Sequence, residues 1–218
     1  DEFYHLDGIL ADIWPDHPPG WLHVWGDEDF PKTWDQQQRV ADEIATMGMM
    51  STPTLAYWDS QSRIREVGPY AEELEYTPAD LFQWSSAEPD SPELGATWRR
   101  ALEAAQKFQR LLLDRNVPVL AGSDTPCGGI LPGQSLWREL TLLVETGLSP
   151  LSALRSATAA AADFLECPEL GRLRKGRAAD IAIVRGDVTL AIPDRPEIEL
   201  VVRDGVSYEP DELLQSAQ

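Results

Sequence analysis

Apolar residues recur at helical spacing along four stretches of the chain. These stretches are residues 34–47, 97–116, 135–146 and 151–165. In the second of them, Leu102, Phe108 and Leu112 fall on one face, while the charged residues fall on the other. This arrangement is typical of an amphipathic helix that packs one side against a core. The sequence therefore predicts four helices.

Short apolar runs alternate with the predicted helices. Residues 117–124 predict a buried strand that ends at Asp124, and residues 49–57 predict another. Because Pro53 cannot donate a hydrogen bond inside a sheet, the second strand is expected to end near residues 53–57. Strands and helices that alternate in this way predict an α/β fold.

The last quarter of the chain has a different character. Residues 179–184 and 198–206 are rich in β-branched side chains and are bounded by turn residues, which predicts short antiparallel strands. Asp180 is expected to be a structural carboxylate that ties this module down. The chain is therefore divided into residues 1–165, residues 166–210 and a tail of residues 211–218.

Residues 59–96 form the least regular part of the chain. Prolines at positions 69, 78, 89 and 92 interrupt any long periodic element. A connection of this length inside a compact domain is typical of a lid or a binding loop. Its aromatic residues, among them Tyr70 and Trp84, fit two roles equally well: covering a substrate, or packing the insertion onto the rest of the domain.

Asp124 is the first candidate functional residue. It ends a predicted strand and precedes a turn-rich loop, residues 125–133, that leads into the helix at 135–146. Barrel and open α/β enzymes place their chemistry at this end of a strand. An aspartate at such a position also initiates turns by accepting hydrogen bonds from nearby amides. The position alone therefore leaves both roles open.

The composition is that of a globular protein with an acidic surface. Hydrophobic residues make up 43% of the chain, and no apolar run approaches the roughly 18 residues that span a bilayer. With 18 basic and 37 acidic residues, the net charge is −19. Because such a surface repels nucleic acid and anionic membranes, we expect neither as a partner. Cys127 and Cys167 lack the spacing of a disulfide framework or a C-x-x-C motif.

Five segments in the second half of the chain follow one another in a distinctive order. They are residues 122–124, 136–140, 145–158, 171–181 and 201–205. In order and spacing they resemble the C-terminal third of the metal-dependent amidohydrolase superfamily, particularly its imidazolonepropionase-like and prolidase-like members. The resemblance implies the C-terminal portion of a (β/α)8 TIM barrel plus part of a small β-sandwich. Trp137 stands where many relatives carry His, and Glu139 is expected to be an exposed or capping charge.

The resemblance also implies a metal centre. Asp124 matches the strand-eight aspartate that contacts the metal and handles the proton of the attacking water, and His5 matches the metal ligand at the end of strand six. Imidazole and carboxylate groups both bind zinc, so one or two divalent ions, zinc first, are expected. Tyr57 and Trp58 are expected to lie near the mouth of the barrel and to bind substrate.

The sequence departs from the family pattern in its histidines. Only His5, His17 and His23 are present, without the H-x-H pair that begins such a barrel, and the last two are expected in loops. A catalytic zinc ion normally takes three protein ligands. A full barrel needs roughly 250 residues, and this chain has 218. We therefore expect a C-terminal fragment, or one half of a split enzyme whose missing N-terminal part completes the barrel.

The function expected from these features is metal-dependent hydrolysis of a C–N amide-type bond in a peptide or a cyclic amide. Two alternatives stay open: a mononuclear deaminase of the same superfamily, and a non-catalytic scaffold or interaction module. The expected partners are a small-molecule or peptide substrate and the missing part of the barrel, and a homo-oligomer is also left open. Because the first residues do not resemble a secretory signal, the expected location is cytoplasmic.

Overall fold

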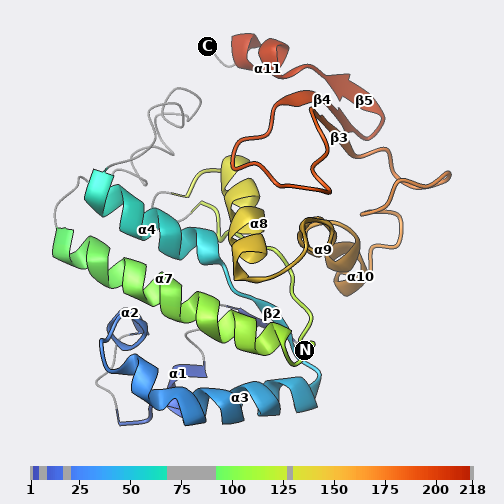
Figure 1. Cartoon of the computed structure of the whole chain (residues 1–218). Helices are drawn as coiled ribbons and strands as arrows, with labels where there is room; N and C mark the ends of the chain where they lie inside the picture. Colours follow the sequence, from blue (N-terminus) through green and yellow to red (C-terminus); the bar gives the residue numbers. More distant parts are fainter. Residues whose placement is uncertain (1, 5–8, 17–20, 68–91, 127–129, 217–218) are drawn as a thin grey trace.

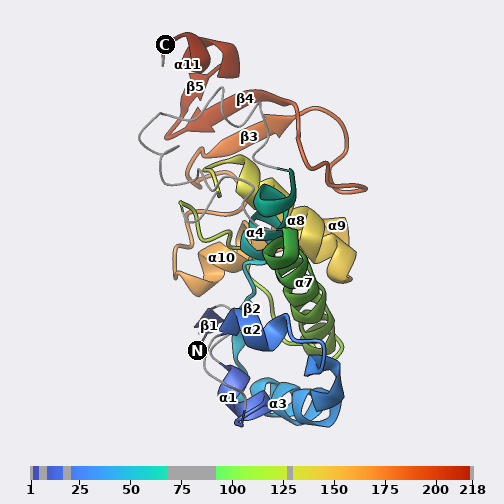
Figure 2. The same cartoon turned by 90° about the vertical axis from the view of Figure 1, so that its left-hand side faces the viewer.

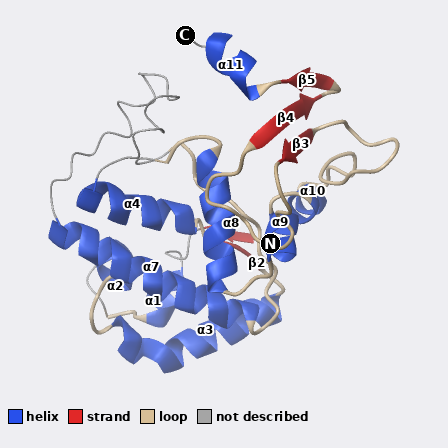
Figure 3. Cartoon of the chain, turned by 45° about the horizontal axis from the view of Figure 1, so that its top comes forward, coloured by secondary structure: helices blue, strands red, loops and turns tan. Residues whose placement is uncertain are grey.

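The computed structural model describes residues 2–4, 9–16, 21–67, 92–126 and 130–216. Several residues singled out in the sequence lie outside these ranges, namely His5, His17, Cys127 and the aromatic residues of the 59–96 insertion. The described part combines many helices with two small sheets (Figure 3). It is therefore a mixed α/β structure, as the sequence predicts.

Helices make up most of the described structure and are labelled in Figure 1. They are α1 (Leu10–Ile13), α2 (Trp21–Trp25), the 3-10 helix η2 (Phe30–Thr33), α3 (Trp34–Met47), α4 (Leu55–Val67), α7 (Pro92–Leu113), α8 (Gln134–Thr146), α9 (Pro150–Ser156), α10 (Ala159–Phe164) and α11 (Pro210–Ser216). The strands are β1 (Glu2–Tyr4), β2 (Met50–Thr52), β3 (Ile181–Val184), β4 (Ile198–Arg203) and β5 (Val206–Tyr208). None of the described helices is both long enough and apolar enough to cross a membrane.

Three described stretches of extended chain run parallel to one another. β1 pairs with β2, with Phe3 opposite Ser51, and Ser51 also forms a parallel bridge with Val119. The Ser51 amide donates to the Pro118 carbonyl, and the Leu120 amide donates to the Ser51 carbonyl, both at 2.9 Å. Residues around Val119 are called the third parallel stretch below. Helices connect the successive stretches, which is the repeating unit of α/β folds.

β2 is shorter than the sequence predicts. It ends at Thr52, and α4 begins at Leu55 after a turn at Thr54, whose φ of +51° lies in the left-handed region. A β-branched residue rarely adopts this conformation, so the turn is strained. The strand stops before Pro53, which cannot donate to a sheet. Residues 55–57 of the predicted strand at 49–57 are therefore helical.

The main core lies between α2, α4 and α7. α4 and α7 lie side by side and run in opposite directions (Figure 1). At the centre, the ring of Trp25 meets the rings of Phe30, Trp58 and Phe108, with centroids 4.7 to 5.9 Å apart. Each of these four side chains has 1% or less of its surface exposed. Tilted and edge-on ring pairs of this kind add to the free energy gained by burying apolar area.

The Ala-rich helix predicted at 151–165 is two helices, α9 and α10. α9 begins after Ser149, whose side chain accepts a hydrogen bond from the Ser152 amide at 3.1 Å, as an N-cap does. It ends at Ser156, whose carbonyl accepts a hydrogen bond from the Ala121 amide at 3.3 Å. This contact joins the end of α9 to the chain that continues from the third parallel stretch.

The C-terminal sheet has the order β3–β4–β5 and is antiparallel, as the sequence predicts. Ile181 lies opposite Val202, and Ile183 lies opposite Leu200, so these four side chains share one face. No described residue from 163 to 213 is buried. The sheet and α11 lie at the opposite end of the molecule from α1 and α3 (Figure 2). This sheet is therefore built without a core of its own.

Polar contacts hold the C-terminal sheet at its margins. The Asp204 amide donates to the Asp180 carboxylate at 2.8 Å, which confirms the structural role predicted for Asp180. Arg185 pairs with Glu197 at 2.8 Å and with Glu199 at 3.0 Å. Because these pairs are exposed, each stabilises the sheet by about 0–1 kcal/mol at most.

Candidate functional site

The carboxyl ends of β2 and of the third parallel stretch lie against each other. A Cβ atom at Gly122 would lie 2.7 Å from Cγ2 of Thr52, so the two chain segments touch where Gly122 has no side chain. Of the strand predicted at 117–124, Val119 alone forms a ladder contact among the described residues. The chain after it is held by this close approach and by individual hydrogen bonds.

We expect the Gly122→Ala variant to be destabilised by about 1–3 kcal/mol, because its new methyl group overlaps the Thr52 methyl group and forces the two segments apart. Denaturant unfolding followed by circular dichroism measures this loss. The matched control is a double variant that adds Thr52→Ser, which removes the overlapping methyl group and keeps the hydroxyl. A double variant no more stable than Gly122→Ala alone would show that this contact is not the cause.

Asp124 is exposed at the end of this segment. Its φ is +60°, a conformation that aspartate tolerates better than most residues. The preceding Ser123 is buried, and its hydroxyl accepts a hydrogen bond from Ser135, in the first turn of α8, at 3.1 Å. The Thr125 hydroxyl donates to the Ile130 carbonyl at 3.1 Å. The chain is thus fixed on both sides of a carboxylate that solvent can reach.

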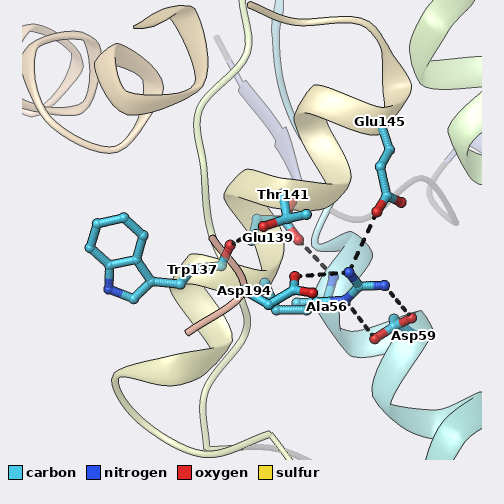
Figure 4. Close-up of polar contacts among 8 residues, drawn as sticks. Ala56, Asp59, Trp137, Glu139, Thr141, Glu145 and Asp194 are labelled. Atoms are coloured by element: carbon cyan, nitrogen blue, oxygen red, sulfur yellow. Dashed lines mark hydrogen bonds and ion pairs between the residues drawn. The ribbon is translucent and has the colours of Figure 1, made fainter. Parts of the chain in front are cut away.

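Glu139 is a fully buried carboxylate on α8, one helical turn after Ser135. Its Oε2 atom accepts a hydrogen bond from the Ala56 amide, in the first turn of α4, at 2.6 Å (Figure 4). Its Oε1 atom has no hydrogen-bond partner of good geometry among the described residues. Burial raises the pKa of Glu139 to about 8, although the Ala56 and Leu55 amides and Arg138 act in the opposite direction.

The sequence predicts Glu139 as an exposed or capping charge, and the structure confirms the cap but not the exposure. The signal for burial is its spacing, because Ser135 precedes it and Leu143 follows it by four residues on the buried face of α8. A charged residue enters a core only when a partner satisfies it. Here the partner is the amino end of α4, where the helix dipole favours negative charge.

Arg138 fastens the same two helices from a more exposed position. Its guanidinium group donates to both carboxylate oxygens of Asp59 on α4, each at 2.9 Å, and to Asp194 at 3.1 Å. Glu145 lies 3.6 Å from the same group (Figure 4). Burial opposes the charge, but Asp59 and Asp194 raise the pKa of Arg138 above its ordinary value. A two-point contact of this kind fixes the orientation of α8 on α4.

Tyr57 and Trp58, which the sequence predicts near the mouth of the barrel, differ in their surroundings. Tyr57 is half-buried, and its ring meets that of Trp98 edge-on, with centroids 5.6 Å apart. Trp58 is 1% exposed and packs between Trp25 and Trp98. Because α4 begins at Leu55, the Trp58 side chain points into the core, and the structure does not place it at an open mouth.

A cavity of about 590 Å³ opens between η2, α3 and α7. Trp25, Phe30 and Trp34 supply aromatic wall, and Arg100 and Lys107 supply charge. None of the described residues that line it belongs to β2, the third parallel stretch or α8. This cavity is thus separate from the strand ends where the sequence places the chemistry.

The metal ligands implied by the resemblance are only partly described. Asp124 is placed as above, and His5, the other implied ligand, lies outside the described residues. His17, which is expected in a loop, also lies outside them, and the side chain of His23 is not described. Among the residues that the structure describes, no three His, Cys, Asp or Glu side chains converge on one point. Since a catalytic zinc ion normally takes three protein ligands, these residues do not fit such a site by themselves.

Several solved structures share the fold of this chain, whereas no curated protein matches it. Bottromycin amidohydrolase matches with a TM-score of 0.64 and 22% identity, over 99% of this chain and 48% of its own. A Xaa-Pro dipeptidase with bound methionine matches with a TM-score of 0.56 and 21% identity, over 78% and 37%. Ochratoxinase from A. niger matches with a TM-score of 0.53 and 19% identity, over 95% and 37%. The chain thus spans less than half the length of each.

The profile of the amidohydrolase family matches residues 100–208, which is half of the chain. The matched stretch runs from α7 to β5 and contains both Asp124 and Glu139. It also covers the five segments in which the sequence resembles this superfamily. The chain belongs to the amidohydrolase family.

Proposed function

We propose that this chain is the C-terminal part of an enzyme that hydrolyses a C–N amide-type bond, with Asp124 as its proton-transfer group. The observation that carries the proposal is the position of Asp124. It is an exposed carboxylate at the carboxyl end of the third of three parallel stretches, inside the segment that matches the family. Enzymes built from parallel strands and helices keep their catalytic groups at this end.

The proposed architecture assigns residues 1–165 to the last three strand–helix units of a (β/α)8 barrel. Residues 166–210 form part of a small β-sandwich, and residues 211–218 are a tail. The parallel pairing of β1, β2 and the third stretch supports the first assignment. The second is supported by the half-exposed apolar face around Ile181 and Leu200, which further strands would cover. The remainder of the barrel would come from polypeptide outside this chain.

The proposed chemistry gives Asp124 two proton transfers. Its carboxylate takes a proton from the water that attacks the amide carbon, and then delivers it to the departing nitrogen. The family resemblance implies one or two divalent ions, zinc first, with His5 and Asp124 among their ligands. The described residues do not complete a metal site by themselves, so further ligands would have to come from the rest of the barrel.

The proposed substrate is a peptide or a cyclic amide, with Tyr57 near the bond that is cleaved. Support comes from solved structures that share the fold, among them a Xaa-Pro dipeptidase, a prolidase complexed with N-methylphosphonate-L-proline and bottromycin amidohydrolase.

Hydrolysis assays on the complete polypeptide that contains this chain test the proposal. Xaa-Pro dipeptides and small cyclic amides serve as substrates, and the metal content of the purified protein is measured alongside. We expect turnover and bound divalent metal in the complete protein, and neither in residues 1–218 alone. Turnover by residues 1–218 alone would refute the partial barrel, and a complete, metal-free protein without turnover would favour a non-catalytic scaffold.

A further inference from the structure

One face of α8 fixes two neighbouring strand ends. Ser135, in its first turn, donates to Ser123 beside Asp124. Glu139, one turn later, accepts from Ala56 in the first turn of α4. Both side chains lie on the buried face of α8. A single helix face therefore sets the position of the end of β2 relative to Asp124.

The turn between β2 and α4 requires support of this kind. Thr54 has a φ of +51°, and a β-branched residue keeps such a conformation only when the surrounding contacts impose it. The Tyr57 amide donates to the Thr54 carbonyl at 3.1 Å, and Glu139 holds the amide that precedes Tyr57. Thr52, where the turn begins, packs against Gly122. The strained turn thus borders the segment that carries the proposed catalytic carboxylate.

We propose that Glu139 is a positioning residue for amide hydrolysis: its buried carboxylate holds the first turn of α4 and, through it, the turn at Thr52–Thr54, which packs against the segment that carries Asp124. This role rests on the proposed function. Glu139 acts through α4 and not on the reacting atoms.

The hold of Glu139 on α4 depends on its charge. An ionised carboxylate accepts amide hydrogen bonds more strongly than a neutral acid does. Burial raises the pKa of Glu139 to about 8, whereas the unfolded chain has the ordinary value of 4.5. The folded state therefore binds an extra proton between these values, and this group's contribution to stability falls as the pH rises from 4.5 to about 8. Above about pH 8 the carboxylate is ionised and its hydrogen bond to α4 is strongest.

The charged groups that face Glu139 come from α8 and α4. Arg138 on α8 favours the ionised form, and Asp59 on α4 opposes it. Asp59 is itself bound to Arg138, so the two largely offset each other. Of the charged residues on the other described helices packed on α8, Arg110 of α7 contacts the far end of α8 at Thr146, and Arg155 of α9 is exposed.

An NMR titration of residues 1–218 tests the contact without reference to activity. In the wild-type chain, the amide signals of Leu55 and Ala56 are expected to shift with a midpoint near pH 8. In Glu139→Gln this shift is expected to disappear. Glu145→Gln, whose side chain is 51% exposed on the same helix, is the matched control and should retain the shift. Because the wild-type titration needs no variant, the test survives if Glu139→Gln does not fold.

Kinetics of the complete enzyme provide the second readout. Glu139→Gln is expected to lower kcat by up to about 100-fold through misplacement of the reacting groups, with KM little changed. The variant should also lose the rise in kcat/KM near pH 8 that the wild-type enzyme and Glu145→Gln share. If Glu139 only stabilised the fold, its substitution would lower the free energy of unfolding and leave this pH profile unchanged.

Two results overturn the proposal. One is a wild-type chain in which the Leu55 and Ala56 amides do not titrate near pH 8. The other is a Glu139→Gln enzyme with wild-type kcat and pH profile. If no form of the enzyme hydrolyses an amide, the proposed function fails by itself, and the titration alone then decides whether Glu139 holds α4.

Discussion

Replacing Asp124 by asparagine is expected to abolish amide hydrolysis by the complete enzyme while leaving its fold unchanged. The two side chains have nearly the same shape, but asparagine cannot take a proton from water. Losing a positioned acid–base group lowers the rate by about 10²–10⁴-fold, and the loss should fall on kcat. Because Asp124 is exposed at the end of its segment and asparagine matches its shape, we expect the substitution to leave the fold unchanged.

The matched control for this experiment is Asp114→Asn. Asp114 is an exposed carboxylate just after α7, ten residues before Asp124. It precedes the third parallel stretch and so does not lie at the carboxyl end of a strand. Denaturant unfolding should give similar midpoints for both variants and the wild type. Retained activity in Asp124→Asn, or an equal loss in Asp114→Asn, would contradict the assignment of proton transfer to Asp124.

The second large effect is expected from Trp58→Ala, which should destabilise the chain by about 3–5 kcal/mol. Trp58 is 1% exposed and touches the rings of both Trp25 and Trp98. Its removal leaves a cavity that the close-packed helices α4 and α7 cannot fill without moving. Denaturant unfolding followed by far-UV circular dichroism measures the change in the free energy of unfolding.

Trp34→Ala is the matched control, because 42% of the Trp34 side chain is exposed. It removes the same group from the surface of the helical part and should cost less than half as much. A Trp58→Ala variant as stable as the wild type would contradict a core role for Trp58. It would instead favour the position near the mouth of the site that the sequence alone predicts.

Much of the helical part follows from local pattern. The apolar positions Leu102, Phe108 and Leu112 identify α7 because their spacing matches the helical period, and all three are buried. The placement of Asp124 at the end of a parallel stretch also follows from sequence, since a short apolar run stops there. These features depend on residues close to one another in the chain.

The missed features depend on contacts between distant segments. Glu139 is buried because the first turn of α4, more than eighty residues earlier, supplies its amide partner. Trp58 turns inward because the strand before it ends at Thr52 and a left-handed residue, Thr54, starts the helix early. The amide partner of Glu139 cannot be read from the residues around Glu139. The left-handed turn at Thr54 has no local signature either, because glycine and asparagine are the usual residues in the left-handed conformation.

The lack of buried side chains between residues 163 and 213 bears on how the molecule unfolds. Because the sheet has no core of its own, we expect it to open at a smaller free energy than the α4–α7 core does. All eight tryptophans precede residue 138, whereas the sheet contains Tyr208. Tryptophan fluorescence therefore follows the helical part and does not report on the sheet. We therefore expect two unfolding transitions of unequal free energy, and a free energy obtained from tryptophan fluorescence would belong to the more stable transition.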